Sequence, residues 1–205
     1  LEQKLHLLTI ASQRPEWQTA YWAAILALNT TMRGCELKGL RWADVDLFEH
    51  TLTIHKSKTA AGERMIPLTE DALQAVLNLR RRAGEYAPVE PSHFVFASFQ
   101  TKFSFHGKRV VQVTIKNFDP TRPLGSWRTA WRTLTRQAGL PGLRFHDLRH
   151  QAITELAESG ASDSTIMAIA GHVSRRMLER YSHARLEAKR IALAALSKRP
   201  GHGPR

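Results

Sequence analysis

Residues 143–183 read LRFHDLRHQAITELAESGASDSTIMAIAGHVSRRMLERYSH, and this stretch sets two histidines, an arginine and a tyrosine in a suggestive order. His146 and Arg149 stand three positions apart, which puts them on one face of a helix. His172 follows His146 by 26 residues, and Tyr181 lies nine residues beyond it. Two possible proton carriers, a permanent cation and a phenol are the groups that in-line attack on a phosphodiester requires. The stretch therefore points to phosphoryl transfer.

A zinc site is a second interpretation of the same stretch, because His146 and His150 have the i, i+4 spacing of a metalloprotease helix. Such a site needs a glutamate general base and a third ligand. Asp147 is too short to replace the glutamate, and Arg149 would put a cation beside the metal ion. Alone, His146 could also be a hydrogen-bonded core histidine. We predict no metal site and no cofactor.

The other candidate residues also have ordinary structural explanations when each is taken alone. His172 could cap the helix before it, and Tyr181 could be a half-buried aromatic side chain. Lys58, in a basic loop, could be a solvated charge or a phosphate contact. Arg33 lies at a bend between apolar segments, where Glu36 could hold it in a structural ion pair. The order and spacing of the whole set favour the functional interpretation.

The charge balance of the chain favours a polyanionic partner. Lys and Arg number 30 against 18 Asp and Glu, so the formal net charge of the 205 residues is +12 and the pI is near 10.5. Nucleic acid is the most frequent partner of such a surface. The alternative is a basic surface that binds nothing.

Cysteine usage and hydropathy restrict the compartment. Cys35 is the only cysteine, so neither an intramolecular disulfide nor a cysteine metal cluster can form, and a reducing compartment fits. No apolar run approaches the ~20 residues that a membrane span requires. The first residues do not form a signal peptide. We expect a cytoplasmic protein, and the missing initiator methionine suggests a piece of a longer one.

Apolar periodicity predicts a mainly α-helical domain with a small antiparallel β-sheet, an α+β fold. Two short strands, at 52–54 and 65–68, flank the basic loop 55–64, and Pro67 suggests an edge position for the second strand. Residues 98–124 are predicted to form a variable loop with a strand at 110–115. The predicted helices span 17–28, 69–82, 126–137, 147–158, a segment from Ser162 or Asp163 to Gly171, 175–181 and 187–196.

Four sets of residues resemble the sequence boxes of the tyrosine recombinase, or phage integrase, family. They are collinear and highly specific together: MRGCEL at 32–37, SKT at 57–59 with RMIPL at 64–68, HDLRH at 146–150, and GH at 171–172 with RYSH at 180–183. The resemblance covers residues 32–183, nearly the whole chain. One departure is Thr31, where the family usually carries a glycine before the first arginine, so the backbone turn there could differ.

The resemblance implies a role for each box in cutting a DNA strand. Arg33 and Arg149 would clamp the non-bridging oxygens of the scissile phosphate with fixed, bidentate donors. Tyr181 would attack this phosphate and hold the DNA 3′ end as a phosphotyrosine. Lys58 would protonate the departing 5′ oxygen, with Lys56 as a neighbouring competitor for that role.

The same resemblance assigns the remaining groups and the conditions of the reaction. His146 would accept the tyrosine proton or orient the phenol, His172 would hydrogen-bond the phosphate, and Glu36 would hold the first box together. Two arginines and an acid would replace the divalent metal of a nuclease, so we expect cleavage without metal or ATP. The residues expected to contact DNA are Arg33, Lys56, Lys58 and Arg149.

The resemblance also implies the organisation of the protein and its partners. Residues 1–197 would be the catalytic domain of a tyrosine recombinase and 198–205 a disordered basic tail, with the family's N-terminal DNA-binding domain absent from this chain. The partner would be double-stranded DNA, on which copies would assemble as a tetramer, whereas a monomer is expected without DNA. A bacterial or phage-encoded, nucleoid-associated enzyme of a mobile genetic element, acting in DNA integration or excision, would fit.

Two rival functions remain open from the residues alone. A type IB topoisomerase would use much the same side chains to relax supercoils, and only details of the boxes separate it from a recombinase. A DNA-binding protein that has kept the fold and lost catalysis is the other rival. The complete set of residues from Arg33 to Tyr181 argues against the second.

Overall fold

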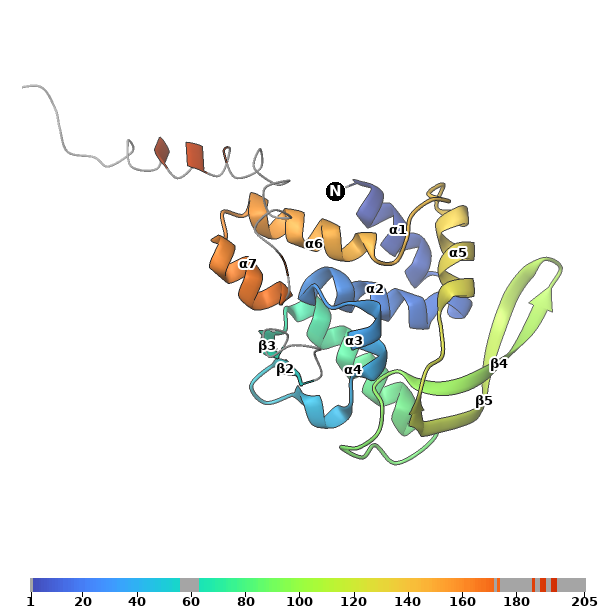
Figure 1. Cartoon of the computed structure of the whole chain (residues 1–205). Helices are drawn as coiled ribbons and strands as arrows, with labels where there is room; N and C mark the ends of the chain where they lie inside the picture. Colours follow the sequence, from blue (N-terminus) through green and yellow to red (C-terminus); the bar gives the residue numbers. More distant parts are fainter. Residues whose placement is uncertain are drawn as a thin grey trace, which may run out of the picture.

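The computed structural model describes residues 2–55, 63–171, 173, 186, 189–190 and 193–194, and it shows helices packed around one central helix with two small antiparallel sheets at the periphery (Figure 1). The predicted fold class is confirmed. The elements are α1 (Glu2–Ser12), η1 (Pro15–Trp17), α2 (Gln18–Thr30), α3 (Gly34–Gly39), η2 (Trp42–Asp44), β1 (Val45–Asp46), β2 (Thr51–Ile54), β3 (Arg64–Pro67), α4 (Glu70–Gly84), β4 (Ala97–His106), β5 (Arg109–Pro123), α5 (Arg128–Gln137), α6 (Asp147–Glu158) and α7 (Asp163–Ala170).

Helix α2 is the centre of the core, because it is apolar around almost its whole circumference. Its sequence QTAYWAAILALNT leaves few polar side chains for solvent, and such a helix is stable only when neighbours cover every face. Helices α1, α3, α4 and α6 all pack against it. A second, smaller apolar cluster joins α6 to α7 through Ile153, Ala157, Ile166 and Ala170. The core therefore fixes the positions of α3, α6 and α7, which carry the candidate site.

Helix α1 was not predicted, and its sequence explains why. Its apolar residues do not gather on one face, so the periodicity that identifies an amphipathic helix is missing. Leu7 and Ala11 are buried against the core nevertheless. Lys4 Nζ also forms an ion pair with Glu155 Oε2 of α6 at 2.7 Å. Tertiary contacts therefore hold this helix in place.

The three-stranded sheet has the order β1-β2-β3, and all neighbours are antiparallel. Leu52 pairs with Ile66, and Ile54 pairs with Arg64, so these side chains share the inner face. Pro67 lies in the edge strand β3, as predicted. The same register turns the Arg64 side chain toward the protein interior.

Hydroxyl side chains lie at the N-terminal ends of three helices. Thr69 Oγ1 accepts a hydrogen bond from the Ala72 amide at 3.3 Å, and Ser162 Oγ accepts one from the Thr165 amide at 3.1 Å. Ser126, in contrast, is not the N-cap of α5, which is Trp127. The Ser126 hydroxyl instead accepts from the Arg128 amide. Hydroxyl side chains at the first turn thus begin each of these helices.

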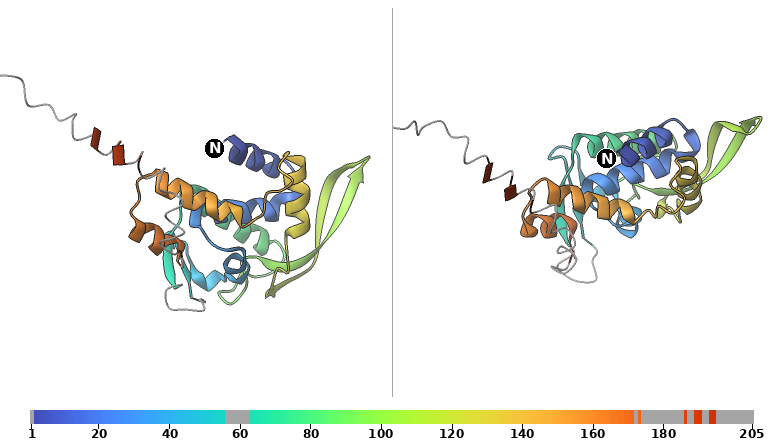
Figure 2. Two further views of the ribbon diagram at one scale, coloured as in Figure 1. Left: turned by 45° about the horizontal axis from the view of Figure 1, so that its top comes forward. Right: turned by 90° about the horizontal axis from the view of Figure 1, so that it is seen from above.

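Residues 97–123 correct the prediction of a variable loop. They form a long antiparallel hairpin, β4–β5, which projects from the side of the molecule in all views (Figures 1 and 2). The predicted strand at 110–115 lies inside β5. Both faces of this hairpin are largely exposed, so the sequence contains no buried apolar run to identify β4. Gly107, with φ of 58°, lies at the turn.

Several predicted segments lie outside the described residues. These are the greater part of the predicted helices 175–181 and 187–196 and the basic tail 198–205. Of the helices in the described part of the chain, none is both long and apolar enough to cross a membrane.

Candidate functional site

The turn between α2 and α3 carries the first candidate arginine. Helix α2 ends at Thr30, and Arg33 is the N-cap of α3. Glu36, in the first turn of α3, closes the turn from both sides: Oε2 accepts from the Arg33 amide at 2.8 Å, and Oε1 accepts from Arg33 Nη1 at 2.9 Å. The Arg33 side chain keeps 30% of its surface exposed. Glu36 thus orients a guanidinium that solvent can still reach.

Thr31, which stands where the family usually carries glycine, adopts a left-handed backbone conformation. Its φ of 57° and ψ of 13° lie in the left-handed region, which suits glycine and is costly for a β-branched residue. The side chain is buried, and its hydroxyl donates to the carbonyl of Ile169 at 3.3 Å. The turn therefore keeps a glycine-like conformation although a threonine occupies it.

This conformation predicts the relative stability of two variants. Thr31→Gly should be more stable than Thr31→Ala by roughly 1 kcal/mol, because both lose the hydroxyl and only alanine keeps a Cβ in the left-handed region. Urea unfolding of the two variants measures the difference. Equal midpoints at equal slopes would show that the turn is not left-handed in solution.

Arg64 is a buried residue of the site that sequence reasoning did not assign. Its side chain, 4% exposed, donates from Nη2 to Glu36 Oε2 at 3.0 Å and from Nη1 to Glu36 Oε1 at 3.3 Å. Its Nε donates to the carbonyl of Ile169 at 2.8 Å. Burial raises the pKa of Glu36, but hydrogen bonds and charge from Arg64 and Arg33 outweigh it and hold the pKa below its ordinary value. Glu36 is therefore a buried anion between two guanidiniums.

Arg149, from the first half of α6, is buried as well, with 4% of its surface exposed. Its Nη1 donates to the carbonyl of Thr31, and its Nη2 donates to the carbonyl of Ala170 at 2.9 Å. Thr31 lies two residues before Arg33. Arg149 therefore ties the first arginine's turn to the end of α7.

The carboxyl end of α7 is the point where these side chains meet. Successive carbonyls of Ile169 and Ala170 accept from Arg64 and Arg149, which is favourable at the negative end of a helix. Gly171 follows with φ of 71°, and a Cβ there would lie 2.9 Å from Arg64 Nη1. Only glycine suits both the backbone and the guanidinium. Two arginines thus anchor the segment that ends at Gly171.

His146 lies at the N-terminus of α6, as its N-cap, and its side chain is exposed. The ring stands edge-on to that of His150, with centroids 4.9 Å apart. Desolvation, then the charges of His150, Arg149 and Arg33, lower the pKa of His146. Its neutral form, which can accept a proton, is therefore favoured near neutral pH.

Asp147 does not serve the two histidines as a metal ligand or base. Its Oδ2 accepts from the Arg144 amide at 2.8 Å, and its Oδ1 accepts from Arg144 Nη2 at 2.8 Å. These bonds and the Arg144 charge lower its pKa. Among the described residues, no group of three or more His, Cys, Asp or Glu side chains is placed to hold a metal ion.

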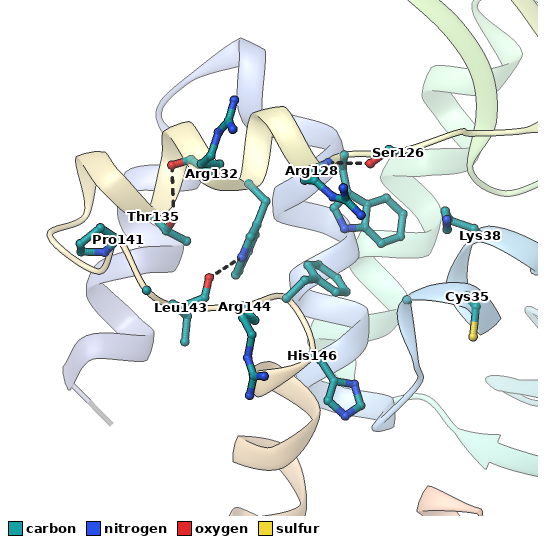
Figure 3. A pocket seen from close by; sticks show the side chains of 15 residues that line it. Cys35, Lys38, Ser126, Arg128, Arg132, Thr135, Pro141, Leu143, Arg144 and His146 are labelled. Carbon is teal, nitrogen blue, oxygen red and sulfur yellow. Dashed lines mark hydrogen bonds between the residues drawn. The ribbon is translucent and has the colours of Figure 1, made fainter.

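A cleft of about 510 Å³ opens beside His146, between α3, α5 and the segment before α6 (Figure 3). Aromatic rings form part of its wall: Phe145 packs against Trp127 at 4.9 Å and against Trp131 at 5.1 Å between centroids. Trp131 Nε1 donates to the Leu143 carbonyl at 2.9 Å. The cationic side chains that line the cleft are Lys38, Arg128, Arg132 and Arg144.

The structure brings four of the predicted site residues together: Arg33, Glu36, His146 and Arg149. Lys56, Lys58, His172 and Tyr181 lie outside the described residues. Arg64 was missed because a four-residue strand gives too short a pattern to reveal which face is buried. Its only sequence signal is that it lies two residues before Ile66, because alternate residues of a strand face the same side and Ile66 is on the inner face of β3. Arg33, Arg64 and Arg149 against Glu36 leave the cluster positive, as an anion-binding site requires.

Known proteins match this chain over most of its length. The model of the phage integrase family matches residues 2–187. The chain is 33% identical over 161 residues to the shufflon-specific DNA recombinase of Escherichia coli, a match that covers 78% of this chain and 33% of that protein. It is 25% identical over 158 residues to the integrase of Salmonella phage P22, a match that covers 77% and 37%. The chain spans about a third of the length of these two relatives.

Solved structures show the same fold. The XerA recombinase has a TM-score of 0.64 at 22% identity, covering 98% of this chain and 65% of that one. The Tn1549 transposon integrase in complex with transposon right end DNA has a TM-score of 0.70 at 20% identity, covering 96% and 64%. The catalytic domain of bacteriophage HP1 integrase has a TM-score of 0.57 at 17% identity, covering 98% and 96%. At these identities the likeness establishes the fold.

Proposed function

This chain belongs to the phage integrase family, and on that premise we propose that it is the catalytic part of a site-specific recombinase that cuts and rejoins DNA through a 3′-phosphotyrosyl link on Tyr181. One observation carries the proposal. The Arg149 guanidinium donates to the Thr31 carbonyl across 118 positions of sequence, so Arg149 lies at the turn that presents Arg33. Two arginines from distant boxes thus meet at one place.

The electrostatics of this place suit a phosphate in transfer. Charge develops on the non-bridging oxygens, and guanidiniums that are already oriented stabilise it without reorganisation. Glu36 orients Arg33, and two carbonyls orient Arg149. Arg33 is the more accessible of the two, so in this proposal it is the first to meet the phosphate, and Arg149 completes the clamp from the buried side.

The remaining roles follow from the family resemblance. Tyr181 attacks the scissile phosphate, so that the bond from phosphorus to the DNA 5′ oxygen breaks and a bond to the phenol oxygen forms. Attack by a DNA 5′ hydroxyl then reverses this exchange, rejoins the strand and releases the phenol. Neutral His146 takes the phenol proton or orients the phenol, and Lys58 protonates the departing 5′ oxygen. His172 hydrogen-bonds the phosphate. Because the link conserves the bond energy, rejoining requires no nucleotide, and the arginines take the place of a metal ion.

The partner in this proposal is double-stranded DNA, and the surface beside the site supports it. Lys38, Arg128, Arg132 and Arg144 line the cleft that begins at His146, which gives a cationic path for a phosphate backbone. Strand exchange between two duplexes would require several copies, for which we propose the tetramer.

The experiment that tests the function uses a nicked DNA trap, in which cleavage releases a short fragment and leaves the protein attached. A denaturant-resistant protein–DNA complex should form in the presence of a chelator. The variant Tyr181→Phe should bind the same DNA but form no denaturant-resistant complex with it. A complex that requires a divalent metal, or binding with no complex from the wild-type chain, would refute the proposal. Exchange of strands between two duplexes, as opposed to relaxation of supercoils alone, separates a recombinase from a topoisomerase.

The lowered pKa of His146 predicts the acid limit of cleavage. A base works in its neutral form, and the pKa of His146 lies below the ordinary 6.5, so the single-turnover rate should persist to a lower pH than an ordinary histidine would allow before it declines. The same shift makes the unfolded state bind the proton more readily, so this residue's contribution to stability is lost as pH falls below 6.5. Rates on the nicked trap across pH measure the limit. His146→Gln should remove this limb, and an unchanged profile in that variant would exclude His146 as its source.

A further inference from the structure

The β4–β5 hairpin has two faces of opposite character. Strand alternation and the register, in which Phe103 pairs with Val113 and Phe105 with Val110, gather these four apolar side chains on one face. The other face carries Gln100 paired with Lys116 and Lys102 paired with Thr114. A further pair, His106 with Arg109, extends this polar face to the turn. The hairpin is therefore an amphipathic arm.

The apolar face is turned toward the body of the protein. It borders a groove of about 700 Å³ whose other walls come from η1, the end of α4 and α5. At the base of the arm, the Arg82 guanidinium lies over the rings of Trp22 at 4.6 Å and Phe99 at 5.4 Å. Its Nη1 also donates to Thr19 Oγ1 at 2.8 Å. These contacts tie the base of the arm to α2 and α4, and the polar face lies on the side away from the groove.

The outer face is cationic along residues 98–116, and the one acid of the hairpin 97–123, Asp119, lies at its base opposite Ser98. Residues 98–116 contain Lys102, Lys108, Arg109 and Lys116 and neither aspartate nor glutamate. All four cationic side chains are exposed. A strand of ten residues is roughly 30 Å long, close to one turn of a DNA duplex. Length and charge therefore match a stretch of phosphate backbone.

We propose that the outer face of the β4–β5 arm binds the phosphodiester backbone of duplex DNA away from the cleavage site, so that the arm holds the substrate without taking part in the chemistry. This inference rests on the proposed function and extends it, because it assigns a second DNA-binding surface to a part of the chain outside the four boxes. A surface that binds another protein is expected to carry acidic as well as basic side chains, whereas residues 98–116 of the arm contain no acid.

The test compares variants that remove the same charge from different places. Lys102→Gln with Lys116→Gln removes two cations from the arm, and Arg80→Gln with Arg81→Gln removes two exposed cations from the last turns of α4. Gln112→Ser with Thr114→Ser changes the arm's outer face without changing its charge. The affinity for a long duplex of arbitrary sequence is measured against salt concentration. The arm variant should lower the slope of log Kd against log salt by about 1.8, at roughly 0.9 for each phosphate that the arm no longer neutralises.

The two control variants should keep the wild-type slope, and the arm variant should give the wild-type yield of covalent complex on the nicked trap at saturating DNA. An unchanged slope in the arm variant, or an equal fall in the α4 variant, would overturn the proposal. A change in the sedimentation of the DNA-free protein without a change in slope would show an association between copies and would also overturn it. Absence of the covalent complex from the wild-type chain would instead refute the proposed function, so the two failures are distinguishable.

Discussion

Replacing Arg149 by lysine should slow cleavage of the nicked trap by roughly 10²–10³-fold, the effect of losing one preorganised donor to a charged transition state. Lysine keeps the charge but presents it at a single point. It cannot reach the Thr31 and Ala170 carbonyls while it also faces a phosphate. The loss should therefore appear in the single-turnover rate at saturating DNA, with little change in affinity.

The matched control for this variant is Arg136→Lys, which makes the same exchange on an exposed side chain in the last turn of α5, outside the cleft. That variant should cleave at the wild-type rate. Because Arg149 is buried, its replacement could also unfold the protein. Urea unfolding of both variants shows whether each is folded under the conditions of the cleavage assay. A folded Arg149→Lys protein that cleaves as fast as the wild type would remove Arg149 from the clamp.

Replacing Arg64 by methionine should destabilise the protein by about 3 kcal/mol, the lower end of the range for breaking a buried ion pair. Glu36 has only 9% of its side chain exposed and would lose two hydrogen bonds from Arg64, although it keeps those from Arg33. The carbonyl of Ile169 would lose the Arg64 Nε donor and keep the longer bond from the Thr31 hydroxyl. Urea unfolding at neutral pH measures the loss.

The pH dependence separates this explanation from simple loss of packing. Glu36 has a lowered pKa in the folded protein, so it contributes stability at neutral pH that disappears as pH falls through its folded pKa. In Arg64→Met most of that contribution should be gone. The double variant Arg64→Met with Glu36→Gln should recover part of the stability, because it removes the uncompensated carboxylate. A double variant that loses the sum of the two single losses would show that the two residues act independently.

The sequence predicted much of the scaffold because its helices obey local rules. Helices α4, α6 and α7 have capping side chains or regular apolar spacing, and their predicted bounds agree closely with the structure. Helix α1 and strand β4 were not predicted, and the reason is the same for both. One has no amphipathic face, and the other is exposed on both faces, so tertiary context rather than local pattern defines them.

The sequence predicted which residues form the candidate site, but it did not predict the hydrogen bonds that connect them. Arg33, Glu36, His146 and Arg149 could be chosen from the boxes. The bonds that orient them could not, because they join segments that are distant in sequence. Arg64 illustrates this: its partners Glu36 and Ile169 lie 28 and 105 positions away. The left-handed Thr31 is similar, since the strained turn depends on hydrogen bonds with Arg149 and α7.

The proposed mechanism depends above all on Arg33 and Arg149 holding a phosphate that Tyr181 attacks. The decisive experiment is to form the covalent complex on nicked DNA in chelator, digest the protein and DNA, and locate the modified peptide by mass spectrometry. We expect a nucleotide on the Tyr181 phenol in the wild-type chain and none in Tyr181→Phe. A nucleotide on any other residue, or a complex that survives Tyr181→Phe, would contradict the mechanism.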